Sequence, residues 1–126
     1  MTIGEVIARV DDLKKNGYRM EEKIQWLSDI EWILKREVFD THTLESDRAK
    51  EYTGYTAKTP LDTVLLCDPP YDLIYVRYLE MMMYYYEGEN VRYENAKLMF
   101  ESVETSFKEF YNREHPASTV RKLVFF

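Results

Sequence analysis

Apolar residues near the start of the chain recur at the three- and four-residue spacing of an α-helix. The stripe begins at Ile3 and ends at Leu13. Thr2 and Glu5 stand at the spacing of a capping box, in which each side chain bonds to the other residue's backbone N–H. The pattern therefore predicts a short first helix with one buried face.

A second apolar stripe predicts a helix from Met20 to Phe39. Glu21 and Glu22 fall in its first turn, where the helix dipole favours anions. The stripe consists of Ile24, Leu27, Ile30, Leu34 and Val38. Trp26 and Trp32 lie off its centre, so they either wrap around its edges or face a neighbouring chain.

The segment from 41 to 67 interrupts the helical pattern. Residues 41–60 are polar and lack periodicity, which predicts a long loop, and Leu61–Cys67 is apolar enough for a short extended segment. A structureless loop of this length is uncommon unless it has a function or orders on binding. We therefore expect the loop to be mobile in the free protein, with Tyr52 and Tyr55 as aromatic anchors at a partner surface.

Two long apolar patterns predict a pair of helices in the second half of the chain. Asp68 and Pro69 are typical of a helix start, so the third helix is expected from Pro69 to Glu87 and the fourth from Val91 to Asn112. The stripe of the fourth helix consists of Tyr93, Ala96, Phe100, Val103, Phe107 and Phe110. The tight connection at Gly88 predicts an antiparallel hairpin. The expected fold class is all-α, a small bundle of about four helices in a single domain spanning residues 1–126.

The third helix is unusually apolar. Between Leu73 and Tyr86 only Arg77 and Glu80 are charged, and they can pair at their three-residue spacing. A helix that is apolar all round must be buried all round. Either it is the central core helix, with tyrosine hydroxyls reaching water, or one side meets another subunit. Because Tyr and Met are enriched at interfaces, the second interpretation is favoured, with Met82 and Tyr85 as candidate contacts.

The last ten residues, 117–126, form an apolar and β-prone tail. Leu123, Phe125 and Phe126 are candidate interaction residues, since large apolar side chains in water are unfavourable and an unpaired strand can pair with another chain. The alternative is that the tail folds back onto its own domain.

Composition argues against several classes of function. The chain of 126 residues has a net charge of −6, which repels phosphate backbones, so we expect no sequence-specific nucleic acid as a partner. No stretch reaches the ~18 apolar residues that cross a bilayer, so no membrane partner is expected. The only cysteine, Cys67, stands in no activating context. Neither histidine belongs to a Glu-x-x-His motif, and phosphate-binding glycine patterns are missing. We therefore expect no catalytic residues, no metal and no cofactor, and the chain is not expected to be an enzyme.

Several short motifs resemble a known family. They are Pro70-Tyr71-Asp72, Tyr78-Leu79-Glu80, Tyr85-Tyr86-Glu87-Gly88-Glu89, Arg92-Tyr93 and Phe110-Tyr111-Asn112-Arg113, together with the N-terminal Met1–Ile7 and Trp26-Leu27. With them the chain, from Met1 to His115, resembles the helical head–tail connector (adaptor) proteins of tailed phages, encoded in prophages of Gram-positive bacteria. The apolar end Leu123–Phe126 is not typical of that family.

The resemblance implies a structural assembly protein. Connector subunits form a homo-oligomeric ring that docks to the phage portal and joins head to tail, so the implied partners are portal and head-closure or tail proteins. The implied location is the virion, and the bacterial host cytoplasm during assembly. The alternative is a small phage regulatory or DNA-packaging protein, similar to a terminase small subunit. That class would carry a basic helix-turn-helix near its N-terminus, and the acidic second helix argues against it.

Overall fold

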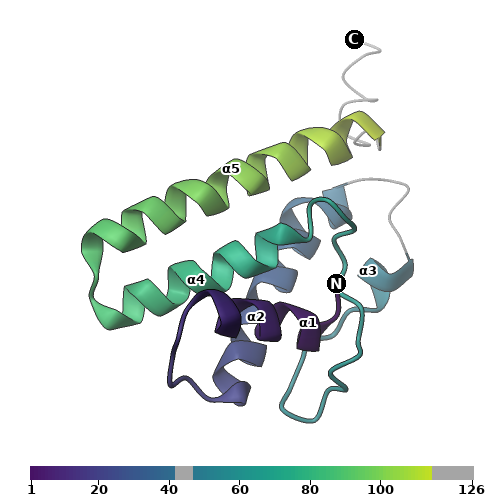
Figure 1. Cartoon of the computed structure of the whole chain (residues 1–126). Helices are drawn as coiled ribbons and strands as arrows, with labels where there is room; N and C mark the ends of the chain where they lie inside the picture. The colour runs from purple at the N-terminus through teal and green to yellow at the C-terminus, as the bar shows by residue number, and fades with distance from the viewer. Residues whose placement is uncertain (42–46, 115–126) are drawn as a thin grey trace.

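The chain folds into a bundle of helices, as Figure 1 shows for a computed structural model that describes residues 1–41 and 47–114. The elements are α1 (Ile3–Leu13), α2 (Met20–Glu37), a 3₁₀ turn (Phe39–Thr41), α3 (Asp47–Glu51), α4 (Leu73–Glu87) and α5 (Asn90–Glu114). The predicted all-α class is confirmed. The capping box at the start of α1 is also present, with Glu5 N–H donating to Thr2 Oγ1 at 3.1 Å and Thr2 N–H to Glu5 Oε1 at 2.9 Å.

Helix α4 forms the centre of the bundle, in contact with α1, α2 and α5. Its buried residues are Ile74, Tyr75, Val76, Leu79, Met81 and Met83. The chain's own helices therefore cover most of this apolar helix, which supports its interpretation as the central core helix. Only its C-terminal end exposes large apolar side chains, Tyr85 and Tyr86.

Helix α5 lies on the outside of the bundle and packs along α4 (Figure 1). The chain reverses direction at Gly88, whose positive φ of 72° suits the left-handed position that ends a helix. The inner face of α5 buries Ala96, Phe100, Phe107 and Tyr111. The opposite face of α5 is exposed, so α5 forms the outer layer over α4.

The start of α4 differs from the prediction. The helix begins at Leu73 and not at Pro69, after a turn in which Tyr71 N–H donates to the Asp68 carbonyl at 3.0 Å. The reason is Pro70, because the residue before a proline is disfavoured in the helical conformation. Pro69 therefore does not occupy the first position of the helix. A proline is acceptable at that position when no second proline follows it.

The connection between α3 and α4 wraps around the N-terminal helices. Its predicted extended part is present as a single antiparallel bridge between Val64 and Thr2. Ile3 N–H donates to the Thr63 carbonyl at 3.0 Å, and Leu65 N–H donates to the Met1 carbonyl at 2.9 Å. These bonds hold the connection against the beginning of α1.

Candidate protein interaction surface

Two of the predicted interaction residues, Tyr52 and Tyr55, lie in the core. They are only 7% and 8% exposed, so the prediction that they are surface anchors is wrong. The Tyr52 ring packs at 4.8 Å from Trp32 and 4.9 Å from Tyr55. Its hydroxyl donates to the Ser28 carbonyl at 2.8 Å. The polar composition of the loop concealed these two rings, which anchor it to α2 of the same chain.

A buried polar cluster around Glu31 holds the same connection in place. Glu31 is 0% exposed. Its Oε2 accepts from the Tyr55 hydroxyl at 2.7 Å and from Leu66 N–H at 2.9 Å, and its Oε1 accepts from the Tyr75 hydroxyl. Cys67 N–H donates to the Tyr75 oxygen at 2.9 Å. One carboxylate from α2 therefore joins the connection to α4.

The Glu31 cluster has the chemistry of a structural site. Burial raises the pKa of the Cys67 thiol well above its ordinary value, the hydrogen bond with Tyr75 lowers it only in part, and the charges of Glu31 and Asp68 raise it further. Burial likewise raises the pKa of the Tyr75 hydroxyl. A neutral thiol is a weak nucleophile, and these groups lie out of reach of a substrate. The cluster stabilises the fold and offers nothing to a partner.

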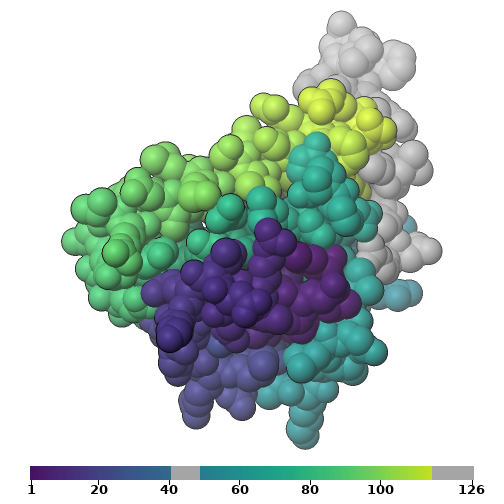
Figure 2. Space-filling view, in the orientation of Figure 1, coloured from purple at the N-terminus to yellow at the C-terminus, as the bar shows by residue number. Residues whose placement is uncertain are grey.

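The other predicted residues of α4 lie at the end where it meets α5. Met82 is half-buried against the core, whereas Tyr85 is 57% exposed. The neighbouring Tyr86 is 62% exposed. This end forms the left edge of the molecule in Figure 2, next to residues that follow α1. The exposed end of α4 is therefore the part of this helix that another chain can reach.

Five aromatic rings at this end form a continuous row, which we call the aromatic row. It runs through Tyr18, Trp26, Tyr86, Tyr85 and Tyr93. Successive centroids lie 5.2, 5.8, 5.2 and 5.7 Å apart, and Trp26 and Tyr86 stack at an interplanar angle of 15°. Such spacings are those of favourable aromatic pairs. The row joins the start of α2, the end of α4 and the start of α5 into one surface.

The surface contains a hollow at one end of the aromatic row. Tyr18, Trp26 and Tyr86 line it together with Glu22 and Gln25, and its volume is about 360 Å³. A cavity of ~150 Å³ can hold a benzene molecule, so this hollow has room for a large side chain of a partner. Its walls are aromatic and its rim carries one carboxylate, a composition that suits an apolar or cationic side chain.

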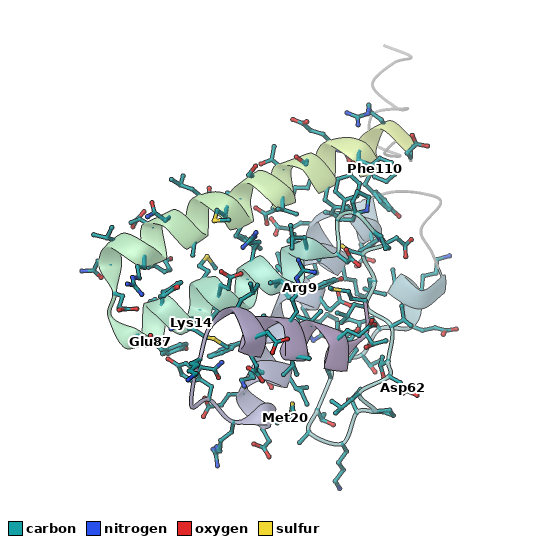
Figure 3. All side chains as sticks on the ribbon, viewed as in Figure 1. Arg9, Lys14, Met20, Asp62, Glu87 and Phe110 are labelled. Carbon is teal, nitrogen blue, oxygen red and sulfur yellow. The ribbon has the colours of Figure 1, made fainter. Side chains whose placement is uncertain are left out.

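Polar contacts fix the aromatic row in position. Lys14 Nζ lies 2.9 Å from Glu87 Oε1, and the two side chains meet between the end of α1 and the end of α4 (Figure 3). Partial burial lowers the pKa of Lys14, but the hydrogen bond and charge of Glu87 outweigh it and the net pKa is raised. The Tyr18 hydroxyl donates to the Met83 carbonyl at 3.2 Å. A surface held in this way loses little conformational entropy on binding.

The remaining predicted interaction residues, Leu123, Phe125 and Phe126, lie outside the described residues. In residues 1–41 and 47–114, no group of His, Cys, Asp or Glu side chains is arranged to hold a metal ion. No helix within those ranges is long and apolar enough to cross a bilayer.

Comparison of the chain with protein-family models, with curated proteins and with solved structures found no match. The assignment of a function therefore depends on the residues themselves and on the surface they form.

The sequence pattern predicted Tyr85 as an interaction residue but missed the other four members of the aromatic row, Tyr18, Trp26, Tyr86 and Tyr93. The available signal was Trp26, which falls off the centre of the α2 stripe and was expected either to wrap around it or to face another chain. Trp26 is 7% exposed because the rings of Tyr18 and Tyr86 cover it. The contact partners come from distant parts of the chain, so spacing along α2 alone could not identify them.

Proposed function

We propose that this chain is a structural subunit of a phage head–tail connector, which assembles as a ring and docks to the portal. The proposal rests first on the family motifs found between Met1 and His115 and on the all-α fold. It also rests on a surface suited to protein contacts. Such a protein would be found in the virion, and in the bacterial cytoplasm during assembly.

The observation that carries the proposal is the exposure of Tyr85 and Tyr86 within the aromatic row. Tyrosine and tryptophan dominate the energetics of protein interfaces because they bury a large area at a small cost in conformational entropy. Here Tyr85 and Tyr86 expose 57% and 62% of their surface at one end of the molecule, beside an aromatic hollow. A ring subunit would use these exposed rings to bind a neighbour or the portal.

The family motifs also coincide with contacts that shape this surface. Tyr85, Tyr86 and Glu87 belong to one motif, and they contribute two rings of the row and the partner of Lys14. Gly88 makes the turn that brings Tyr93 next to Tyr85. The resemblance and the surface therefore support the same assignment by partly different routes.

A binding experiment with a portal protein of a tailed phage tests the proposal. The double variant Tyr85→Ser, Tyr86→Ser removes the two exposed rings, and we expect sedimentation to show at least a tenfold loss of affinity. The matched control is Leu98→Ser. It removes a similarly exposed apolar side chain (65%) that lies on α5, outside the aromatic row. Absence of any portal binding by the unmodified chain, or an equal loss in both variants, would contradict the proposed function.

A further inference from the structure

A second aromatic site lies at the opposite end of the helix pair, where α5 ends. Phe39, Tyr71, Phe107, Phe110 and Tyr111 form the walls of a pocket with a volume of about 200 Å³, which we call the terminal pocket. Figure 3 shows Phe110 near the end of α5. The aromatic row contributes no residue to the terminal pocket.

The walls of the terminal pocket are fixed by contacts with one another. Phe39 meets Tyr111 edge to face at 5.0 Å, and Tyr71 stacks on Phe110 at 4.9 Å. Phe39, Phe107 and Tyr111 are 3%, 3% and 6% exposed, so their rings belong to the core. The pocket is consequently preformed, and an occupant needs no rearrangement of its walls.

The volume indicates what the terminal pocket can hold. An apolar cavity of ~150 Å³ accommodates benzene, so about 200 Å³ fits a single phenyl ring or a branched aliphatic side chain. Five aromatic rings line the pocket together with Leu66, Asp68 and Pro69, and aromatic pairs prefer the edge-to-face and offset geometries that these rings offer. The same chain carries two phenylalanines, Phe125 and Phe126, in the segment that follows α5.

The position of the pocket along the chain makes its own C-terminus the best-placed ligand. Tyr111 lies three residues before Glu114, after which residues 115–126 follow. Twelve residues can span roughly 40 Å when extended, far more than the return to this pocket requires. A short tether also gives an effective concentration on the order of millimolar, which a separate molecule rarely reaches.

The charge beside the terminal pocket is also complementary to that of the C-terminal segment. Asp68 lines the terminal pocket and is exposed, so its carboxylate places negative charge at the opening. Arg121 and Lys122 immediately precede the apolar end Leu123–Phe126. A phenylalanine inserted in the pocket would therefore bring these cations towards a carboxylate.

We propose that the terminal pocket binds a phenylalanine, Phe125 or Phe126, of the same chain's own C-terminal segment. This docking removes an apolar side chain of that segment from water. The inference does not depend on the proposed function, because it uses neither the portal nor the aromatic row.

Nuclear magnetic resonance of the full-length chain tests this inference. The double variant Phe125→Ser, Phe126→Ser should shift the ring signals of Tyr71, Phe107 and Phe110. A synthetic peptide of residues 120–126 should then bind to the variant and restore the original shifts. The same peptide should bind at least tenfold more weakly to the unmodified chain, because the tethered segment competes with it. The matched control is Val120→Ser, which removes an apolar side chain from the same tail and should leave the ring signals unchanged.

Two results would overturn the inference. The first is that the ring signals stay the same in the double variant, or that the peptide binds equally to both proteins. The second comes from mixing isotope-labelled chain with unlabelled chain that carries a spin label at Thr119→Cys. The label attaches selectively because the native Cys67 is buried. Strong broadening of the pocket signals in this mixture would assign the pocket to the tail of a second copy.

Discussion

At the scale of single residues, Glu31 decides how the middle of the chain folds. Its carboxylate accepts from the Tyr55 and Tyr75 hydroxyls and from Leu66 N–H, and each of these donors is itself buried. A buried donor that loses its acceptor costs about 1–3 kcal/mol, so the cluster matters most through what its removal would leave unsatisfied.

The loss in free energy of unfolding caused by a substitution of Glu31 should increase with the number of acceptor oxygens that it removes. Glu31→Gln keeps the shape but offers one acceptor oxygen in place of two, and should lower the free energy of unfolding by about 1–3 kcal/mol. Glu31→Ala removes both oxygens and leaves a cavity, so a loss of about 3–5 kcal/mol is expected. Urea denaturation measures both, with the exposed Glu21→Gln as the control, which should stay within about 0.5 kcal/mol. Equal losses for Glu31→Gln and Glu31→Ala would show that the number of acceptor oxygens does not determine the contribution of Glu31 to stability.

At the scale of elements, α1 and α2 are joined by one ion pair. Lys23 Nζ lies 2.8 Å from Asp11 Oδ1, and the Lys23 side chain is only 7% exposed. Partial burial raises the pKa of Asp11, but hydrogen bonds from Lys23 and Asn16 outweigh burial, and the net pKa lies below its ordinary value of 3.8. A carboxyl group with a lowered pKa in the folded state stabilises the protein above its unfolded pKa.

Asp11→Asn should therefore reduce stability in a pH-dependent way. At neutral pH we expect a loss of about 0.5–1 kcal/mol, a small value because the Asp11 side chain is 42% exposed and screened by solvent. As the pH falls below about 4, through the folded pKa of Asp11, the unmodified chain loses this contribution and the difference between the two proteins should narrow. Thermal melts between pH 3 and pH 7 test this, and a constant difference would contradict it.

The packing of α5 gives a second prediction at this scale. Phe100 and Phe107 are 8% and 3% exposed on its inner face, so truncation of either to alanine should cost about 3–5 kcal/mol. Glu101→Ala, on the exposed face, should change the free energy of unfolding by no more than about 0.5 kcal/mol. Similar small losses for all three variants in urea would show that the inner face of α5 is assigned incorrectly.

Local spacing predicted the elements that depend on local bonds. The capping box of Thr2 and Glu5 and the ion pair of Arg77 with Glu80, at 3.0 Å, both formed as expected. Spacing failed where burial depends on distant residues. Glu31 was one of the acidic residues of the second helix, and Tyr52 and Tyr55 stood in a polar segment. Their burial depends on hydrogen bonds to partners 24 to 44 residues away, which no local pattern encodes.

At the scale of the whole molecule, the two ends of the helix pair differ in their expected partners. The aromatic row at one end exposes Tyr85 and Tyr86 and is suited to another protein, whereas the terminal pocket at the other end is matched to residues 125 and 126 of the same chain. A contact between two different patches on neighbouring copies repeats head to tail, and it closes into a ring when the rotation allows. A connector ring as proposed would use the aromatic row as one of these two patches.

Light scattering over a range of concentrations tests self-association in solution. We expect the mean mass of the unmodified chain to rise with concentration, and that of Tyr85→Ser, Tyr86→Ser to rise less, because each exposed ring contributes apolar area to the contact. The Phe125→Ser, Phe126→Ser variant measures how much the tail contributes to self-association, independently of Tyr85 and Tyr86. Equal association by all three proteins would show that neither Tyr85 and Tyr86 nor Phe125 and Phe126 form the contact between copies.

The most direct test of the proposed connector function is electron microscopy of the chain mixed with a portal protein of a tailed phage. Our account predicts a closed ring of this chain seated on the portal along the portal's symmetry axis, and loss of that ring with Tyr85→Ser, Tyr86→Ser. Portal particles that carry no added density at saturating concentrations of the chain would contradict it.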